Sequence, residues 1–474
     1  MHEPASASKT TLERFHALWQ AYRYREGLQL IPALISATGL EPVQLLSAAN
    51  SLYSSGRFQE AALLSGKAWR MVPQDPRLSL VHAEILERCG DFNKAREAIE
   101  PLLAASVARA VRLEGHILRR ENRLEEAATV LERQLRDHRS GDDWRLQYEL
   151  AAVLDRMGRY PEAMAVLLQA KAALRNDAAP HRDQWRRMAD FQWELTHSIQ
   201  PAHLRRWREE PQLGNEPSVC LMAGFPRSGT TLVEKILGCH PGCTGTDESG
   251  ILASQFRDDI VFGAASPSAA LAEIDGFTGD ELQAGRAEYF RATAEFTGQD
   301  LEGKWIVEKE PLLTADLPLP LRLFPGSRVL MPLRDPRDVL VSFFFTIVPL
   351  NWSSAAAISL EDSAKYYAET MRHWLHLRDM QDPSSWSECR YEELVKTPDA
   401  EIRRLCAFLD LQPVPEMFQH HQQPERLIAR TPTYGDVREP VHSRSVGRWR
   451  HYAEWIEPHH GVLRPTMEAF GYAL

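Results

Sequence analysis

Four short motifs in the N-terminal half of the chain recur at nearly even spacing, and this repetition constrains the fold more than any other feature. The motifs GRFQEA, GDFNKA, NRLEEA and GRYPEA begin at residues 56, 90, 122 and 158, which gives spacings of 34, 32 and 36 residues. Each has an apolar residue at its third position and alanine at its sixth, and stretches with helical apolar periodicity lie on both sides. One unit is therefore a helix, a turn marked by Gly or Asn, and a second helix that the small alanine allows to approach closely.

A period near 34 residues with this layout resembles the tetratricopeptide repeat. The third unit departs from the pattern, because Asn122 and Leu124 replace the glycine and the aromatic residue of the other units. An irregular helical bundle is the alternative. Stacked repeats form a solenoid with an extended concave surface, which suits a peptide or a protein partner.

The sequence pattern changes near residue 209. The helical pattern ends at EEPQLGNEP (209–217), which contains two prolines and a glycine. Beyond it, SVCLMAGF, KWIVEK and SRVLMPLR are short apolar runs of strand type, each followed by a turn and a helical pattern. This alternation predicts a mainly parallel sheet covered by helices. We therefore expect an α + α/β protein of two domains, a helical repeat domain at 1–208 and an α/β domain at 209–474.

Composition and charge limit the classes of partner. The chain of 474 residues is 44% hydrophobic and 25% charged, as in globular proteins, and its formal net charge of −10 argues against nucleic acid as a partner. Six cysteines in a chain of this length do not make a disulfide framework, and no Cys/His set has zinc-ligand spacing. Neither a signal peptide nor an apolar run of about 20 residues occurs, so we expect a cytoplasmic protein without a membrane span.

The segment GFPRSGTT (224–231) joins an expected strand to an expected helix. A glycine-bearing turn in this position presents backbone N–H groups to a phosphate. Both glycines and the last threonine fit the nucleotide-triphosphate pattern GxxxxGK(S/T), but Thr230 stands in place of the lysine. Without that lysine a γ-phosphate loses its main cationic contact, which argues against ATP or GTP hydrolysis and against a nucleotide kinase. Arg227 supplies positive charge elsewhere in the loop, and a purely structural turn is the alternative.

A second candidate anion site lies in SRVLMPLRDPRDVLVSFFF (327–345). Arg334 falls at the end of an expected strand, and Ser342 lies on the helix that follows Pro336. An arginine binds a phosphate through two parallel charge-assisted hydrogen bonds, to which a serine hydroxyl adds another. The alternative is structural, an ion pair between Arg334 and Asp335 that caps the helix.

Together these motifs resemble the sulfotransferases that use 3′-phosphoadenosine-5′-phosphosulfate (PAPS), above all the tyrosylprotein sulfotransferases and the bacterial sulfotransferases with tetratricopeptide repeats. Three further motifs follow in the family's order, EKEP (308–311), YEELV (391–395) and VREPVHSRSVGRW (437–449). The resemblance covers residue 218 to about residue 455. It implies a P-loop-like α/β domain that moves a sulfuryl group from PAPS to a hydroxyl acceptor and releases PAP, with no metal ion.

The resemblance also assigns roles to individual residues. The loop of PRSGTT type would hold the 5′-phosphosulfate, and an arginine followed eight residues later by a serine would hold the 3′-phosphate. Lys309 matches the lysine that stabilises the bridging oxygen and the sulfuryl group, and Glu248 matches the catalytic base, a role that the adjacent Asp247 could share. Tyr391 would lie against the adenine, and Arg448 near the 3′-phosphate. The implied donor-binding residues are Arg227, Ser228, Gly229, Thr230, Thr231, Arg334, Ser342, Tyr391 and Arg448.

Several alternatives stay open at this point. On the residues alone, Glu248 fits a solvated acidic turn, Lys309 a surface ion pair with its flanking glutamates, and Tyr391 a core position. No motif defines the acceptor: a tyrosine of a peptide or protein held partly by the repeats is compatible, and so is a small molecule or glycan. The other class of function is a repeat-based interaction scaffold with an inactive transferase domain, against which the full set of motif residues argues.

Overall fold

The computed structural model describes residues 3–209, 217–347, 349–422, 430 and 441–474. Its contacts divide the chain into two compact units, Met1–Leu174 and Arg175–Leu474. Each unit buries an apolar core of its own. No helix in this described part of the chain combines the length and the apolar character needed to cross a bilayer.

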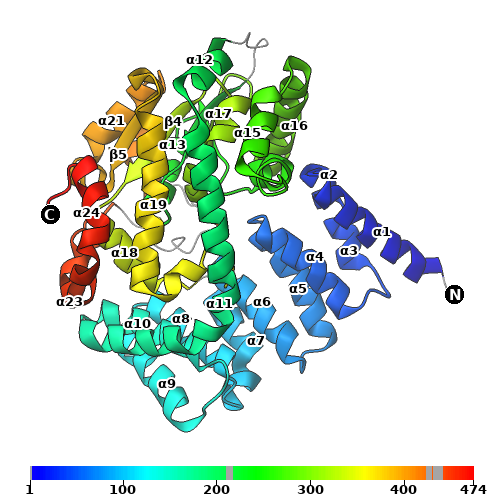
Figure 1. Cartoon of the computed structure of the whole chain (residues 1–474). Coiled ribbons are helices and arrows are strands. Elements are labelled where there is room, and N and C mark those ends of the chain that lie inside the picture. Colours follow the sequence, from blue (N-terminus) through cyan, green and yellow to red (C-terminus); the bar gives the residue numbers. More distant parts are fainter. Residues whose placement is uncertain (1–2, 210–216, 348, 423–429, 431–440) are drawn as a thin grey trace. The chain divides into compact units, whose positions relative to one another are not determined.

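The described residues of the first unit form helices joined by short turns (Figure 1). From α4 to α10 each helix packs against the next, as in stacked helix pairs. The helices are α1 (Glu3–Gln20), α2 (Tyr24–Gln29), α3 (Ile31–Ser36), α4 (Pro42–Ser54), α5 (Phe58–Met71), α6 (Pro76–Cys89), α7 (Phe92–Ala104), α8 (Ala108–Arg120), α9 (Leu124–Asp137), α10 (Asp143–Arg156) and the first part of α11 (Tyr160–Ser198).

The four sequence motifs mark the turns between paired helices, as predicted. The first residue of every motif has the left-handed backbone conformation that favours glycine or asparagine. These residues are Gly56, Gly90, Asn122 and Gly158, with φ of 74°, 83°, 61° and 77°. The sixth residue of every motif is a fully buried alanine at a helix–helix contact, and these are Ala61, Ala95, Ala127 and Ala163. The predicted helix–turn–helix repeat is therefore confirmed.

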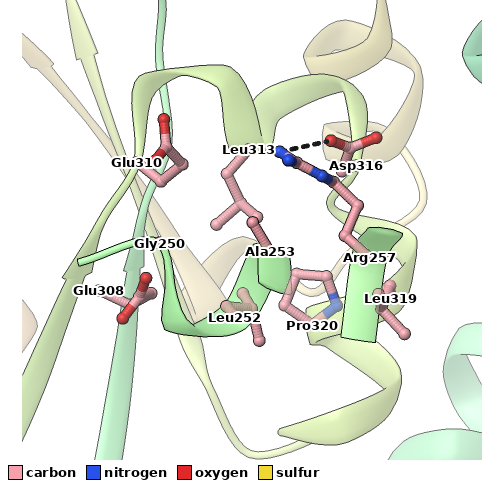
Figure 2. Close-up of a pocket in the computed structure, with 10 residues that line it drawn as sticks. All are labelled: Gly250, Leu252, Ala253, Arg257, Glu308, Glu310, Leu313, Asp316, Leu319 and Pro320. Atoms are coloured by element: carbon pink, nitrogen blue, oxygen red, sulfur yellow. Dashed lines mark ion pairs between the residues drawn. The ribbon is translucent and has the colours of Figure 1, made fainter. Parts of the chain in front are cut away.

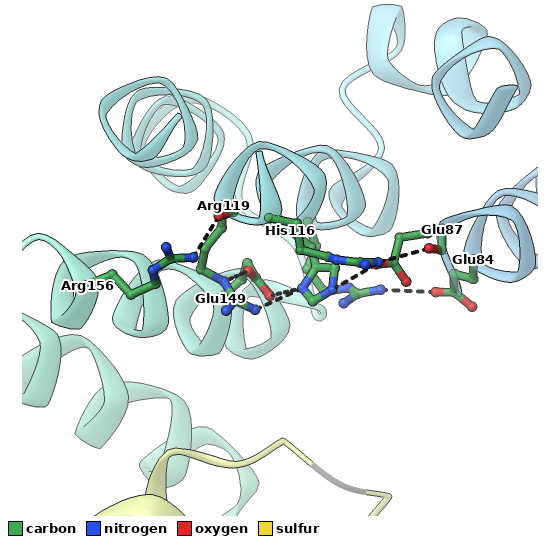
Figure 3. Close-up of polar contacts among 8 residues, drawn as sticks. Glu84, Glu87, His116, Arg119, Glu149 and Arg156 are labelled. Atoms are coloured by element: carbon green, nitrogen blue, oxygen red, sulfur yellow. Dashed lines mark hydrogen bonds and ion pairs between the residues drawn. The ribbon is translucent and has the colours of Figure 1, made fainter. Parts of the chain in front are cut away.

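A row of charged side chains links neighbouring helices of this unit (Figure 3). The two ring nitrogens of His116 on α8 lie 3.3 Å from Glu87 of α6 and 3.2 Å from Glu149 of α10. Arg119 donates to Glu149 at 2.6 Å, and Arg120 donates to Glu87. Burial by itself would raise the pKa of Glu87, but His116 and Arg120 lower it to about 2. These acids are therefore held ionised by cations on adjacent helices.

Helix α11 crosses the division between the two units. Gln192, in its second half, donates to Asp316 at 2.6 Å, and Thr196 shares a hydrogen bond of 2.9 Å with His373. The contacts thus divide the chain before residue 175, earlier than the change in sequence pattern. The limits 1–208 and 209–474 remain a proposal for where the two sequence patterns meet, and residues 210–216 lie outside the described residues.

The second unit contains a sheet of five strands in the order β2-β3-β1-β4-β5, and every recorded strand pair is parallel. The predicted helical region followed by an α/β domain with a parallel sheet is confirmed. The strands are β1 (Ser218–Met222), β2 (Cys243–Gly245), β3 (Trp305–Lys309), β4 (Arg328–Leu333) and β5 (Trp386–Arg390).

Helices of this unit follow the strands or connect them (Figure 1). The sheet has apolar strands because its core is buried: Cys220 and Met222 of β1 pack with Val233 and Ile236 of α13. The longer helices are α12 (Pro201–Glu209), α13 (Thr230–Gly238), α15 (Pro267–Gly276), α16 (Gly279–Thr297), α18 (Pro336–Phe345), α19 (Leu360–Arg378), α21 (Pro398–Phe408) and α24 (His460–Ala469). Shorter helical segments are η1 (Ala253–Arg257), α14 (Asp258–Ile260), η2 (Pro311–Ala315), α17 (Pro318–Leu323), η3 (Ala355–Ile358), η4 (Pro383–Ser385), α20 (Tyr391–Lys396), α22 (Pro415–Phe418), η5 (His420–Gln422), η8 (Arg448–Tyr452), α23 (Ala453–Ile456) and η9 (Glu457–His459).

Candidate active site

The carboxyl ends of three strands meet at the centre of the sheet, because β1 lies between β3 and β4. Met222 at the end of β1 is paired with Lys309 at the end of β3, and β4 ends at Leu333, directly before Arg334. Ligands of parallel α/β sheets bind at such an edge. The topology therefore brings together three motifs that are far apart in the sequence.

The loop after β1 has a backbone conformation that few residues other than glycine adopt. The φ angle is 134° at Gly224, 77° at Arg227 and 98° at Gly229, the residue before α13. Arg227 is thus a non-glycine residue held in the left-handed region, a strain that clusters at ligand sites. Thr314 of η2 fastens the loop, because its hydroxyl accepts from the N–H of Gly224 at 2.7 Å and donates to the carbonyl of Gly224 at 2.5 Å.

The two predicted anion-binding motifs form one site. Nε of Arg227 donates to the hydroxyl of Ser342 at 3.0 Å, and Arg334 donates to the carbonyl of Arg227 at 3.2 Å. Asp335 caps α18 by accepting from the N–H of Arg337 at 2.9 Å, and it also pairs with the guanidinium of Arg337. The cap expected in the structural alternative is therefore present, but its arginine is Arg337, and Arg334 turns toward the loop.

Two buried donors at this site have no hydrogen-bond partner among the described residues. They are the hydroxyl of Ser228 and Nε of Arg334, in residues that are 3% and 6% exposed. A buried polar atom without a partner costs about 1–3 kcal/mol, so two such atoms where a loop meets a helix fit a ligand that accepts hydrogen bonds. The buried hydroxyls of Thr230 and Thr231 begin α13 next to them. This set of hydroxyl, guanidinium and backbone N–H groups suits phosphate.

Tyr391 and Arg448 lie beside the same site. The ring of Tyr391 packs on Gly229, since a Cβ atom placed on this glycine would come within 2.8 Å of the ring. The guanidinium carbon of Arg334 lies 5.0 Å from the centre of the Tyr391 ring. The guanidinium of Arg448, at the start of η8, lies 4.9 Å from the ring of Phe345 at the end of α18. The predicted donor-binding residues are thus gathered around the loop and α18, and their contacts with a nucleotide stay predictions.

Asp338 holds the C-terminal segment against α18. Its carboxyl group, in a residue that is 1% exposed, accepts from the N–H groups of Gly447 at 2.7 Å and Trp449 at 2.8 Å. Arg334 adds a hydrogen bond of 2.5 Å to the carbonyl of Ser445. Burial raises the pKa of Asp338, although Arg334 and the two N–H groups oppose this shift. These contacts fix the backbone on both sides of the arginine in η8, whereas residues 437–440 of its motif lie outside the described residues.

Lys309 is fully buried and contacts three carboxyl groups. Its Nζ lies 3.1 Å from Glu248, 3.2 Å from Asp247 and 3.4 Å from Glu234. A second cation, Lys235, lies 3.6 Å from Asp247. The predicted base and the predicted lysine are therefore direct neighbours, and the alternative of a surface ion pair for Lys309 is wrong.

The charges in this cluster control one another. Burial alone would lower the pKa of Lys309, but Glu234, Glu248 and Asp247 raise it well above its usual value. Burial would also raise the pKa of Asp247, yet Lys235 and Lys309 lower it. For Glu234 burial prevails, and the pKa is raised. Of the three acids Glu248 is the most exposed, with 32% of its side chain accessible, so an acceptor hydroxyl can reach it most easily.

The turn that carries the two neighbouring acids is strained. Asp247 and Glu248 have φ of 48° and 57°, and two consecutive non-glycine residues in this region cost about 1–3 kcal/mol each. Glu234 holds the turn by accepting from the N–H of Asp247 at 2.7 Å, and the carbonyl of Lys309 accepts from the N–H of Glu248 at 3.2 Å. Arg430 donates to Asp247 and to the carbonyl of Glu248, each at 2.9 Å. Strain held by several partners is typical of functional sites.

Sequence analysis missed three residues that shape the site, Glu234, Asp338 and Thr314. Glu234 did carry a signal, because it is an acid inside an apolar helix, next to the buried Val233 and close to Ile236. Asp338 and Thr314 carried none. Their partners lie about a hundred residues away in the chain, and no local pattern reports such a pairing.

The arrangement suits the transfer of an anionic group between two oxygen atoms. The loop and its arginine can hold an anion, the buried cation of Lys309 can neutralise charge that develops on a leaving oxygen, and Glu248 can accept a proton from a hydroxyl. Within the described ranges, no three or more His, Cys, Asp or Glu residues are placed to hold a metal ion.

Two stretches of this chain match models of known protein families. Residues 220–416 match the model of the Sulfotransferase family, and residues 52–113 match that of the Tetratricopeptide repeat. The protein-tyrosine sulfotransferase of Drosophila melanogaster is 22% identical over 49% of this chain and 47% of its own length. An uncharacterized protein of Aquifex aeolicus (strain VF5) is 24% identical over 82% of this chain and 50% of its own length. This chain thus spans about half the length of these relatives. The solved sulfotransferase domain of the Synechococcus PCC 7002 olefin synthase matches 56% of this chain and 98% of that domain, with 19% identity and a TM-score of 0.40.

Proposed function

We propose that the sulfotransferase domain of this chain, which follows its tetratricopeptide repeats, transfers the sulfuryl group of PAPS to a tyrosine hydroxyl of a peptide or protein. The observation that carries the proposal is the pair of buried donors without partners, on Ser228 and Arg334, beside Arg227 and Ser342. These groups suit a nucleotide with phosphate at its 5′ and 3′ positions. The choice of tyrosine rests on the relative named as a protein-tyrosine sulfotransferase. A cytoplasmic location and a protein partner on the repeats belong to the same proposal.

In this proposal the residues at the carboxyl ends of β1, β2 and β3 perform the transfer. Glu248 takes the proton of the acceptor hydroxyl while its oxygen forms the new S–O bond. The S–O bond to the 5′-phosphate breaks, and the electron pair leaves with PAP. Lys309 neutralises the charge that develops on the bridging oxygen, and its three carboxylate neighbours keep it protonated. The loop that contains Arg227 positions the donor for this in-line exchange.

Transfer of radiolabelled sulfate from PAPS to tyrosine-containing peptides, with labelled ATP as the competing donor, tests the reaction. Replacing the base by Glu248→Ala should remove most turnover and leave the affinity for PAP, measured by calorimetry, nearly unchanged. Loss of PAP affinity together with turnover would contradict the base assignment. The matched control is Glu288→Ala, an exposed acid on α16 that pairs with Arg291, and it should behave as the unchanged protein.

The two phosphate positions can be tested separately. Arg334→Ala should weaken PAP about 10- to 100-fold, because a hydrogen bond to a charged group contributes about 1.5–3 kcal/mol. Adenosine 5′-phosphosulfate lacks the 3′-phosphate, so its affinity should change little. Equal losses for both nucleotides would mean that Arg334 serves the loop and not the 3′-phosphate.

The same assay separates the remaining alternatives. Faster transfer to small phenols or glycans than to any tyrosine peptide would reassign the acceptor. PAP binding without transfer to any of these acceptors would favour an interaction scaffold with an inactive transferase domain.

A further inference from the structure

A small pocket opens beside Gly250, two residues after Glu248 (Figure 2). It lies among β3, η1, η2 and α17, and it has room for about one water-sized group. Part of its wall is apolar, from Leu252, Ala253, Leu313, Leu319 and Pro320. Its charged lining consists of Glu308, Glu310, Asp316 and Arg257, and we call it the carboxyl pocket.

The carboxyl pocket lies at the same end of β3 as Lys309. Successive side chains of a strand point to opposite faces, so Glu308 and Glu310 share one face and Lys309 takes the other. Figure 2 shows the two glutamates along this part of the chain, with Asp316 and Arg257 joined by an ion pair on the far side of the pocket. The pocket is therefore next to the proposed transfer site and separate from the lysine cluster.

The acids of the carboxyl pocket accept hydrogen bonds from neutral groups and have further capacity to accept. A carboxylate offers about four lone-pair positions, so one or two donors leave the others available. The donors are the hydroxyl of Tyr289 to Glu308 at 2.6 Å, the N–H of Leu312 to Glu310 at 3.3 Å, and the side chain of Gln192 to Oδ1 of Asp316 at 2.6 Å. Glu308 has a second side-chain hydrogen bond, with Thr246.

Asp316 shows this spare capacity most clearly. The residue is 2% exposed, and its Oδ2 accepts no hydrogen bond from any described residue. Arg257 approaches this oxygen only to 3.7 Å, beyond hydrogen-bond distance. A buried carboxylate oxygen in a pocket wall without a donor fits a ligand that brings a donor with it.

The pocket contains more acid than base. Burial raises the pKa of Glu308 and of Glu310 to about 7, and that of Asp316 to about 6, because one guanidinium cannot neutralise three acids. The charged groups around the pocket do not remove this excess of acid. Glu234 and Lys309 lie near Glu308, Glu248 lies near Glu310, and Asp258 lies near Asp316. A positively charged ligand group would lower all three pKa values and be bound in return.

We propose that the carboxyl pocket is an acceptor subsite, which binds a primary ammonium group on the molecule whose hydroxyl is sulfated. The inference rests on the proposed function in one respect, namely that transfer takes place at Glu248 and Lys309. An ammonium group has the size of a water molecule and three N–H donors, one of which can bond to the Oδ2 of Asp316 that lacks a donor. A guanidinium is too large for this space, and a carboxylate is repelled. The amine can belong to a small amine-bearing phenol, or to a lysine or free N-terminus near a tyrosine.

Three phenols that differ only in charge test the proposal. Tyramine, N-acetyltyramine and 4-hydroxyphenylacetate present the same hydroxyl with a positive, a neutral and a negative tail. We expect kcat/KM to be at least about tenfold higher for tyramine than for N-acetyltyramine, and lowest for the acid. A tyrosine peptide with an adjacent lysine, compared with its acetyl-lysine form, tells whether the amine comes from a peptide. Equal kcat/KM for the charged and neutral members of both pairs would overturn the proposal.

Conservative variants separate the subsite from the general charge of the protein. Asp316→Asn keeps the oxygen that accepts from Gln192, and Glu310→Gln keeps an acceptor for the backbone, so both should fold. Each should reduce the preference for tyramine to about threefold or less, mainly through KM, with little change for N-acetyltyramine. Glu288→Gln, on the surface of α16, should keep the full preference. A full preference in both pocket variants, with unfolding unchanged, would show that the amine binds elsewhere.

Binding without transfer distinguishes a failure of this inference from a failure of the proposed function. Calorimetry of tyramine and N-acetyltyramine should show tighter binding of the amine, increasing between pH 6 and pH 8 as the pocket acids ionise, and lost in Asp316→Asn. This result supports the subsite even if no sulfate is transferred, in which case the proposed function fails alone. Transfer that is indifferent to charge, as expected if the pocket holds only a water molecule, rejects the subsite and leaves the proposed function standing.

Discussion

The two units of the chain bury acids in opposite ways. In the repeat unit Glu87 and Glu149 each contact a histidine and an arginine from neighbouring helices, and these cations lower the pKa of Glu87 to about 2 and that of Glu149 further. In the second unit Glu308 has hydrogen bonds with neutral hydroxyl groups, those of Tyr289 and Thr246, and burial raises its pKa to about 7. In the repeat unit the charge of each acid is neutralised by side chains of the fold. In the second unit the acid has no such neutralising partner, and it could bind a positively charged ligand.

This difference gives the two regions opposite dependence on pH. The folded pKa of Glu87 lies below its ordinary value of 4.5, so the stability it contributes is present above that pH and is lost as the pH falls toward 2. The folded pKa of Glu308 lies above 4.5, so its contribution is complete below that pH and is lost as the pH rises through 7. The pKa of a buried acid is therefore lowered where its partners are cations of the fold, and raised where its partners are neutral.

Removing an acid from the repeat network should have the largest effect. Glu149→Gln leaves the partly buried Arg119 and His116 beside a neutral amide, which should lower the free energy of unfolding by about 3 kcal/mol. Hydrogen exchange of the full chain, followed by mass spectrometry on peptides of α8 and α10, measures this locally. Glu126→Gln, at the exposed partner of Arg123, is the control and should leave exchange unchanged. A loss below about 1 kcal/mol would break the comparison, because the network would then be no more than a set of surface ion pairs.

In the carboxyl pocket, the same replacement of an acid by an amide should raise the free energy of unfolding. Glu308→Gln keeps an acceptor for Tyr289 and removes a charge that burial disfavours. A raised pKa of this size corresponds to about 3 kcal/mol, so the variant should gain that much stability at pH 8 and almost none at pH 4.5. Urea unfolding at the two pH values, with hydrogen exchange on peptides of β3, provides the measurement. A gain in stability that is the same at both pH values would mean that it does not come from removing the buried charge of Glu308.

Local patterns predicted much of this structure. The residues that need a left-handed turn or a buried small side chain recur in each repeat, so Gly56 or Ala61 could be placed without knowing the rest of the chain. The loop around Arg227 and the strand before Arg334 were equally local. The contacts of Asp338 could not be predicted, because its partners lie 109 and 111 residues away. The contact-based division of the chain at residue 175 depends on such pairings too.

The acids beside Lys309 teach a different lesson. One alternative of the sequence analysis paired Lys309 with its flanking glutamates as neighbours in the chain, although the alternation of a strand sends Glu308 and Glu310 to the opposite face. This two-residue alternation could have been recognised in the sequence, and it would have placed Lys309 on the face of the strand opposite both glutamates. Its partners Glu234, Asp247 and Glu248 come from a helix and a turn that only the fold brings near.

Asp338 is a third kind of buried acid, with neither the cation partners of the repeat unit nor the neutral side-chain donors of the carboxyl pocket. We expect its substitution to have the smallest effect. Its two oxygens accept from two backbone N–H groups, and no cation is in contact with it at ion-pair distance among the described residues. In Asp338→Asn one oxygen becomes an amide that cannot accept, so one of the two hydrogen bonds that position the segment around Arg448 is lost. A loss of about 1–1.4 kcal/mol corresponds to PAP affinity about five- to tenfold weaker, with adenosine 5′-phosphosulfate nearly unaffected.

Titration with acid should reproduce this effect in the unchanged protein. Burial raises the pKa of Asp338 above its ordinary value of 3.8, so protonation begins at a higher pH than for an exposed aspartate and removes one acceptor as the substitution does. PAP affinity should therefore fall on acidification in the unchanged protein and fall less in Asp338→Asn, while Asp379→Asn, an exposed acid at the end of α19, should follow the unchanged protein. Identical acid dependence in all three proteins would place the titrating group elsewhere. Asp338 would then be a permanently satisfied acid, like those of the repeat unit, with backbone donors in place of cations.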